Sequence, residues 1–163
     1  MTTPAATSIL TEIGTRLNNI TQANGYHNTV KKVSRAKLTP FKGHDLPAVN
    51  YWSTGISNER TVYDDDNREL SVYIEIHDLT RDNPFVDVAN LLASDVVTAI
   101  ARADSAPKVS DSADYDLTES VSDMVLGSIN YEIGEGQAPW CGALIELTVK
   151  YQCAPFVMDS YSA

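Results

Sequence analysis

The stretch that most constrains the fold lies near the C-terminus, where apolar and polar residues alternate over residues 142–152. The apolar members of this series are Ala143, Ile145, Leu147, Val149 and Tyr151. Successive side chains of a strand point to opposite faces of a sheet, so the alternation predicts a strand with one apolar face. Such a face is stable only when a second layer of structure covers it.

Further strands are predicted from alternation and from the turn residues between segments. They are residues 28–38, 46–52, 61–63, 69–77 and 121–133, with an acidic turn at 64–67. Residues 134–142 are rich in turn-forming residues, which favours antiparallel pairing of the two C-terminal strands.

Two amphipathic helices supply the covering layer. Thr3-Pro4 and Asn83-Pro84 each place proline directly after a capping residue, which is a helix-start pattern. Apolar residues then recur at three- and four-residue spacing, at Ala6, Leu10, Ile13, Leu17 and Ile20 and at Phe85, Val88, Leu92, Val96 and Ile100. The first helix is expected to stop at Asn24-Gly25, because glycine tolerates the left-handed conformation that ends helices. The predicted class is α+β: one mostly antiparallel β-sheet with two amphipathic helices packed on one face.

The 163 residues are predicted to form a single domain, with an acidic loop at 104–120 and a C-terminal tail at 155–163. Hydrophobic residues make up 43% of the chain and charged residues 21%, which is typical of a soluble globular protein. We see no apolar run of the roughly 20 residues that a membrane span requires. The N-terminus does not show the pattern of a secretion signal.

The two cysteines, Cys141 and Cys153, lie at opposite ends of the last predicted strand. An extended strand holds them roughly 35–40 Å apart, whereas a disulfide needs Cα atoms within about 7 Å. Two free thiols in a reducing compartment are therefore expected.

The net charge of −10 is unevenly distributed along the chain. Residues 1–50 carry six basic and two acidic side chains, whereas residues 103–136 carry one basic and eight acidic ones. So acidic a chain is a poor candidate for wrapping DNA, because phosphate neutralisation requires Lys and Arg. The basic third can face an acidic partner or form an ordinary solvated surface. Candidate interface residues are Lys31, Lys32, Arg35, Lys37, Asp111, Asp114 and Asp116.

A cluster of ionisable residues at the end of strand 69–77 is the candidate site for chemistry. Its members are Glu75, His77, Asp78 and Asp82. On a strand, Glu75 and His77 point to one face and Asp78 to the other, so the strand offers at most two of the three or four ligands of a zinc site. A histidine on the polar face of a strand end explains the pattern; a metal or ligand site around His77 is the alternative.

Other motifs for chemistry are missing from the sequence. Residues 64–69 are acidic but lack the glycine and the spacing of a calcium loop. There is no Gly-x-Ser-x-Gly, phosphate-binding glycine loop or dinucleotide fingerprint. Cys141 follows Trp140 without a partner histidine in a recognisable pattern. No cofactor is predicted, and the balance favours a structural or interaction protein over an enzyme.

The order of segments resembles the tail terminator proteins of long-tailed bacteriophages and the related minor tail and tail-completion proteins. The resemblance rests on LNNITQANGYHNTVKKV, LPAVNYW, LSVYIEIHDLTRDNPFVDVANLLASDVVTAI and LIELTVKYQC, in this order. It covers most of residues 8–152 and consists of apolar patterns. The acidic residues 104–120 and the tail after Pro155 have no counterpart in it.

The resemblance implies a small α+β subunit that forms a ring, commonly a hexamer. Such a ring caps the head-proximal end of the tail tube, ends tail polymerisation and presents a surface to the head connector or neck protein. The resemblance brings no catalytic residues and no cofactor. DNA is expected to pass through the lumen without sequence readout, and the subunit to be assembled in the host cytoplasm and to reside in the virion.

The charge distribution suggests how neighbours in such a ring make contact. The basic first third of one subunit can pair head-to-tail with the acidic residues 103–136 of the next, and such a contact closes into a ring when the rotation per subunit permits. Three alternatives stay open: a head–tail connector or neck ring, a small cytosolic enzyme or ligand-binding domain that uses the His77 region, and a regulatory protein that binds a basic partner.

Overall fold

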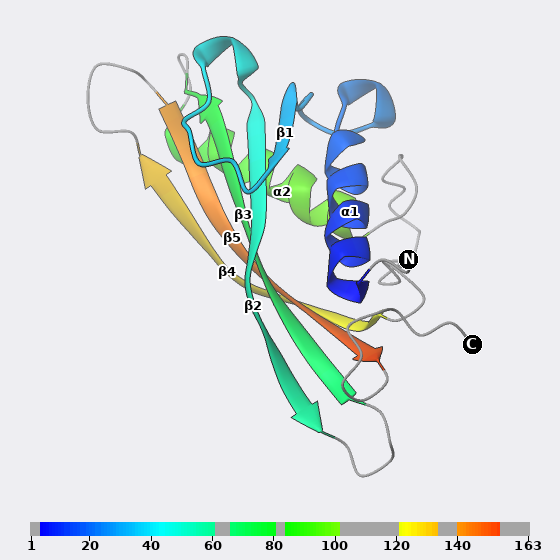
Figure 1. Ribbon diagram of the computed structural model, residues 1–163. Coiled ribbons are helices and arrows are strands. Elements are labelled where there is room, and N and C mark those ends of the chain that lie inside the picture. The colour runs from blue at the N-terminus through cyan, green and yellow to red at the C-terminus, as the bar shows by residue number, and fades with distance from the viewer. Residues whose placement is uncertain (1–3, 61–65, 81–83, 102–120, 134–139, 154–163) are drawn as a thin grey trace.

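The computed structural model describes residues 4–60, 66–80, 84–101, 121–133 and 140–153. The elements are α1 (Ala5–Asn18), η1 (Gln22–Asn24), β1 (Lys32–Arg35), η2 (Gly43–Asp45), β2 (Ala48–Arg60), β3 (Asp66–Leu79), α2 (Phe85–Ile100), β4 (Val121–Ile133) and β5 (Trp140–Cys153) (Figure 1). The predicted acidic loop at 104–120, the predicted tail at 155–163 and the predicted short strand at 61–63 lie outside the described residues. None of the described helices is long and apolar enough to cross a membrane.

The strands form one sheet in the order β1-β2-β3-β5-β4. β2, β3, β5 and β4 pair antiparallel with their neighbours, and β1 runs parallel to β2 over four residue pairs. The predicted hairpin of the two C-terminal strands is confirmed. β1 and β4 thus lie at opposite edges of a mostly antiparallel sheet, and β2 and β3 run on past the helices at one end (Figure 1).

Both helices pack against one face of the sheet, as predicted (Figure 1). α1 lies over β1 and β2, and α2 lies mainly over β3 and β5. The strand residues buried beneath them are Val49, Tyr51, Leu70, Val72, Ile74, Ile76, Ala143, Ile145, Leu147, Val149 and Tyr151. The alternation in β3 and β5 therefore marks the core face. Neither α1 nor α2 covers the opposite face, which we call the outer face.

Two buried polar side chains connect α2 to α1 and to the segment that precedes β1. The Arg16 guanidinium of α1 donates to the carbonyl of Ile100 at the end of α2 at 2.8 Å, where the helix has free acceptors. The Asp95 carboxylate of α2 accepts the backbone N–H groups of His27 at 3.0 Å and Asn28 at 2.8 Å. A buried carboxylate requires such partners, so α2 fixes the segment that leads into β1.

The predicted end of the first helix at Asn24-Gly25 is wrong, because α1 already ends at Asn18. Side chains here offer the backbone other partners: Asn24 Nδ2 donates to the Asn19 carbonyl at 2.8 Å, and Thr21 caps η1. Gly25 does adopt the left-handed conformation, with φ 87°, but at the end of η1. Ile20 stays buried after the break, which is why the apolar spacing overran the helix.

The strand boundaries also differ from the prediction. β1 is confined to Lys32–Arg35 instead of 28–38, because Asp95 holds the preceding backbone and Ala36 turns the chain with φ 52°. β2 extends to Arg60, eight residues beyond the predicted end at Trp52. Asp66 and Asn67 were expected in a turn but begin β3, where they pair with Arg60 and Glu59. The charged ends of this long hairpin lack the apolar alternation that marks a strand in sequence.

Gly14 provides a test of how tightly α1 packs on the sheet. A Cβ at Gly14 would lie 2.2 Å from the hydroxyl oxygen of Tyr51 on β2. Alanine normally favours a helix over glycine by about 1 kcal/mol, but overpacking a core costs about 1–3 kcal/mol. We expect Gly14→Ala to lower the free energy of unfolding in chemical denaturation, and to cost less in a Tyr51→Phe background. A Gly14→Ala protein as stable as the parent would contradict this packing.

Candidate functional site

The described sheet ends in two open strand edges on opposite sides. β1 pairs with β2 only over Ala48–Tyr51, and among the described residues no strand continues this pairing along the rest of β2. β4 pairs with β5 on one side, and its other side has no strand partner in the described part of the chain. Open edges present rows of N–H and C=O groups that favour pairing with another chain.

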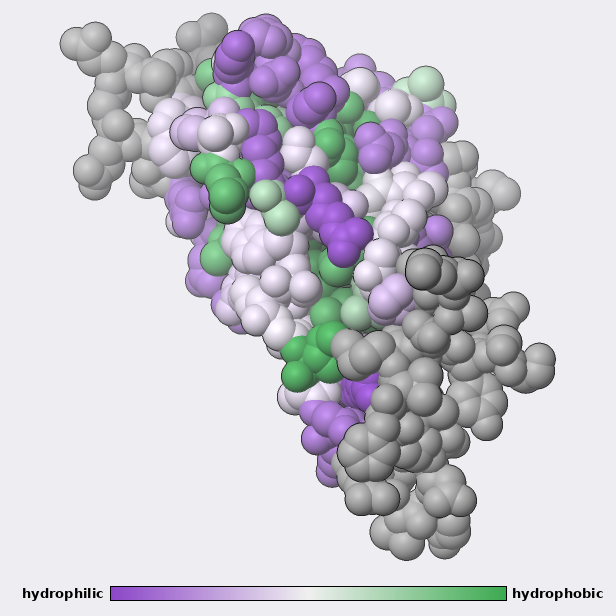
Figure 2. All heavy atoms as spheres, viewed as in Figure 1, coloured by the Kyte–Doolittle hydropathy of each residue, from purple (hydrophilic) through white to green (hydrophobic). Residues whose placement is uncertain are grey.

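The β1 edge is basic, and the structure brings four predicted interface residues together there. Lys31, Lys32 and Arg35 are exposed, and Lys37 follows in the next turn, half-buried. Residues 28–42 contain no Asp or Glu. Figure 2 shows the face that carries α1, β1 and β2, where hydrophilic side chains predominate and hydrophobic ones form smaller separate areas.

The opposite edge, formed by α2 and β4, is acidic and partly apolar. Neither Phe85–Ile100 nor Val121–Ile133 contains a Lys or Arg. The Tyr131 hydroxyl of β4 donates to the Asn90 side chain of α2 at 2.9 Å, which joins the two elements. We call this surface the α2–β4 rim; its exposed residues include Val86, Asp87, Leu91, Leu126, Tyr131 and Glu132.

The other predicted interface residues, Asp111, Asp114 and Asp116, lie outside the described residues. Their sequence position before β4 is consistent with the acidic character of this edge. Their role in a contact between subunits stays a prediction.

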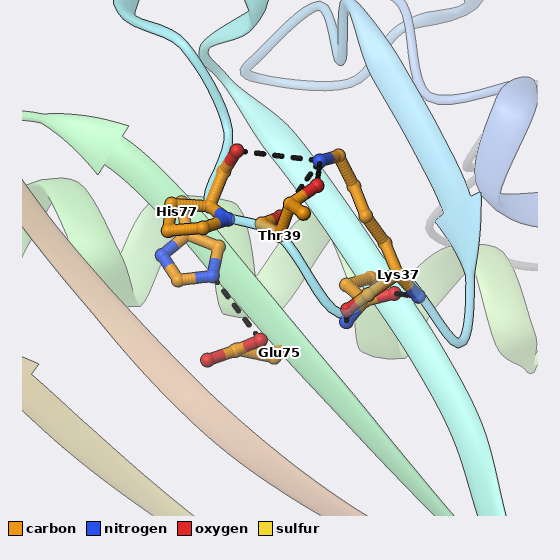
Figure 3. A network of polar contacts seen from close by, with 6 residues as sticks. Lys37, Thr39, Glu75 and His77 are labelled. Carbon is orange, nitrogen blue, oxygen red and sulfur yellow. Dashed lines mark hydrogen bonds and ion pairs between the residues drawn. The ribbon is translucent and has the colours of Figure 1, made fainter.

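Two members of the predicted cluster, Glu75 and His77, lie at a cleft on the outer face, and Figure 3 shows how their side chains lie. His77 Nε2 and Glu75 Oε2 are 3.3 Å apart, so the two side chains share one face, as predicted. The His77 ring lies between the rings of Phe41 and Trp140, with centroid distances of 5.6 and 6.0 Å. The cleft has a volume of about 600 Å³. Its further lining includes Leu38, Pro40, Leu46, Asn50 and Leu79.

A well-held loop forms one wall of this cleft. The Asn50 side chain accepts the backbone N–H of Lys37 at 2.9 Å and donates to the Lys37 carbonyl at 3.1 Å. The Lys37 ammonium donates to the carbonyls of Thr39 at 2.7 Å and Pro40 at 3.2 Å, and also contacts the Thr39 hydroxyl (Figure 3). The Lys37 ammonium therefore binds within its own loop, whereas Lys31, Lys32 and Arg35 are exposed.

The cleft does not gather the predicted ionisable cluster into one site. Asp78 is buried on the helix side of β3 and pairs in register with Cys141, away from Glu75 and His77. Asp82 lies outside the described residues. Among the residues that the structure describes, no group of three or more His, Cys, Asp or Glu is placed to hold a metal ion. The described site thus offers a His–Glu pair flanked by aromatic rings.

The aromatic neighbours of His77 were not identified from the sequence. Trp140 reaches the cleft because β5 pairs with β3 so that Gly142 is opposite His77. A Cβ at Gly142 would lie 2.5 Å from the Ile76 carbonyl oxygen, so glycine permits this close pairing. Phe41 reaches the cleft through the loop that Asn50 holds. Both positions depend on strand register, which a single strand pattern does not specify.

The sequence matches no protein-family model and no curated protein.

Cys141 is not placed to act as a nucleophile. Burial raises the pKa of its thiol from 9.0 to about 11, and the nearby Asp78 carboxylate adds to this effect. The reactive form of cysteine is the thiolate. Cys141 and Cys153 are both free and buried, which confirms the prediction that they do not form a disulfide.

The raised pKa of Cys141 predicts a dependence of stability on pH. The unfolded chain loses the thiol proton near pH 9, whereas the folded chain holds it until about pH 11. Stability should thus fall as pH rises between these values, by up to about 3 kcal/mol. We expect chemical denaturation to show a shallower decline for Cys141→Ala than for the parent chain. Parallel declines in the two proteins would contradict the assignment.

Proposed function

We propose that this chain is a structural subunit that assembles head-to-tail into a closed ring. The observation that carries the proposal is the contrast between the two edges of its sheet. One edge holds exposed Lys31, Lys32 and Arg35 with no acidic residue nearby in sequence, and the other holds Asp87 and Glu132 with no basic residue on either element.

This contrast favours a heterologous contact over a two-fold one. In a two-fold dimer the same patch of each subunit meets its own copy. The basic edge would then face a second basic edge, or the α2–β4 rim would face a second acidic rim. Like charges brought together at an interface are unfavourable. Contact between unlike edges pairs opposite charges, and repetition of one heterologous contact produces a ring or an open filament.

Ring closure also resolves the open edges of the sheet. A free edge of Val121–Ile133 in a monomer invites uncontrolled pairing. In a ring each subunit covers the α2–β4 rim of its neighbour, so the edge of β4 is no longer exposed. The exposed apolar residues on that rim then find partners, as is usual in the core of a lasting interface.

We further propose that the ring is a tail terminator of a long-tailed bacteriophage. This step rests on the resemblance of the segments, and the observed order of a helix, three strands, a helix and two strands agrees with it. The ring would cap the head-proximal end of the tail tube and meet the tube protein on one side and the head connector on the other. DNA would pass through the lumen without specific binding. A neck or connector ring would use the same subunit contact.

The cleft at His77 supports a second candidate function, binding of a small organic ligand. Clefts of a few hundred Å³ with aromatic walls and a few polar groups are typical ligand sites. A small molecule that co-purifies with the parent chain and is lost in His77→Ala would favour this function over a purely structural one.

Charge reversal at the two edges tests the head-to-tail contact. Lys31→Glu, Lys32→Glu and Arg35→Glu together make both edges acidic, and Asp87→Lys with Glu132→Lys makes both edges basic. We expect each variant alone to need roughly tenfold higher concentration to assemble at low salt. An equimolar mixture should recover assembly, because subunits can alternate around an even-numbered ring. Sedimentation velocity measures both effects.

The matched control is Lys150→Glu, which reverses a charge on the interior strand β5, where Lys150 faces Glu69 at 3.6 Å. It should assemble like the parent chain. If the edge variants also assemble like the parent, or if their mixture stays as dissociated as each variant alone, the proposed contact is wrong.

A further inference from the structure

Leu38 is the most exposed large apolar residue among the described ones. Its side chain is 97% exposed, whereas the other exposed large apolar residues range from 39% to 46%. Single exposed apolar residues are common on protein surfaces. Leu38 differs from these in that specific contacts hold the loop around it.

The loop holds Leu38 in a fixed, outward position. The Ala36 N–H donates to the Tyr51 carbonyl at 2.8 Å, and Ala36 adopts a φ of 52°, which is costly for a residue with a Cβ. The buried Asn50 side chain then binds both backbone groups of Lys37. The Lys37 ammonium binds the Thr39 and Pro40 carbonyls on the far side of Leu38 (Figure 3). Strained backbone that its surroundings enforce is typical of functional positions.

These contacts do not serve to bury Leu38 within its own chain. Leu38 borders the cleft at His77, but at 97% exposure its side chain covers almost none of it. The arrangement instead resembles a preorganised anchor. Because the loop is already ordered before a partner binds, binding does not have to offset the entropy cost of ordering it. Interfaces commonly depend on a few such side chains that enter a pocket of the partner.

We propose that Leu38 is the apolar anchor of the contact between neighbouring subunits, and that it packs against the α2–β4 rim of a second copy of this chain. The charge of the two edges selects this occupant: Leu38 lies in the segment that follows the exposed Lys31, Lys32 and Arg35, and the rim carries Asp87 and Glu132. The rim also exposes the apolar side chains that a leucine requires, Val86, Leu91, Leu126 and Tyr131. This inference rests on the proposed head-to-tail assembly.

Substitution of Leu38 tests the anchor without disturbing the fold, because the side chain is free of contacts that a monomer needs. Leu38→Asn keeps a similar size but removes the apolar surface, and we expect it to raise the concentration for assembly by at least about tenfold. Leu38→Met, the matched control, should assemble nearly as the parent does. Thermal unfolding of the dissociated chains should be the same for Leu38→Asn and the parent.

Cross-linking identifies the surface that Leu38 meets. Because Cys141 and Cys153 are buried, a short bis-maleimide should join only introduced cysteines. A mixture of Leu38→Cys and Leu91→Cys chains should give a 38–91 product, and Leu38→Cys alone should give no 38–38 product. A 38–38 product, or neither product in assembled samples, would overturn the anchor.

The outcomes separate this inference from the function on which it rests. If the parent chain forms rings and Leu38→Asn forms them at the same concentration, the anchor is wrong and the ring function stands. If the parent chain remains monomeric at every concentration, both are wrong. If Leu38→Asn dissociates the rings and the 38–91 product forms, both are supported.

Discussion

Burial of one face of the sheet beneath α1 and α2 is the constraint on which the rest of the structure depends. The apolar alternation in β3 and β5 creates a single face that must leave water, and both helices are used to cover it. With the helices committed to that face, the outer face and both edges of the sheet remain open in the described chain. The features with functional interest lie on these open surfaces: the cleft at His77, the basic β1 edge and the α2–β4 rim.

Buried polar contacts fix the positions of the helices and of the segments beside β1. Arg16 joins the two helices, and Asp95 holds the segment that leads into β1. Asn50 does the same for the loop that carries Leu38, with both backbone groups of Lys37 as partners. Each of these side chains is costly to bury and is satisfied by specific hydrogen bonds. Asp95 and Asn50 thus hold the segments before and after β1 in place, which connects these buried contacts to the proposed assembly surface.

The sequence predicted the features that depend on local pattern. Alternation around Ile74 and Ile145 identified strands and their buried face, and the spacing in residues 85–100 identified α2. The end of α1 at Asn18 was missed, because asparagine and threonine side chains redirected the chain while Ile20 kept the apolar spacing. The pairing of distant strands could not be predicted from the residue pattern within one strand. Neither the approach of Trp140 to His77 nor the position of β4 at an edge of the sheet follows from such a pattern.

The central claim is that unlike edges of one chain meet to close a ring. Negative-stain electron microscopy of the unmodified chain, with mass measurement over a range of protein concentrations, tests it most directly. The account predicts closed rings of about six subunits that form as concentration rises. A compact monomer at all concentrations, or a two-fold dimer that grows no further, would contradict it.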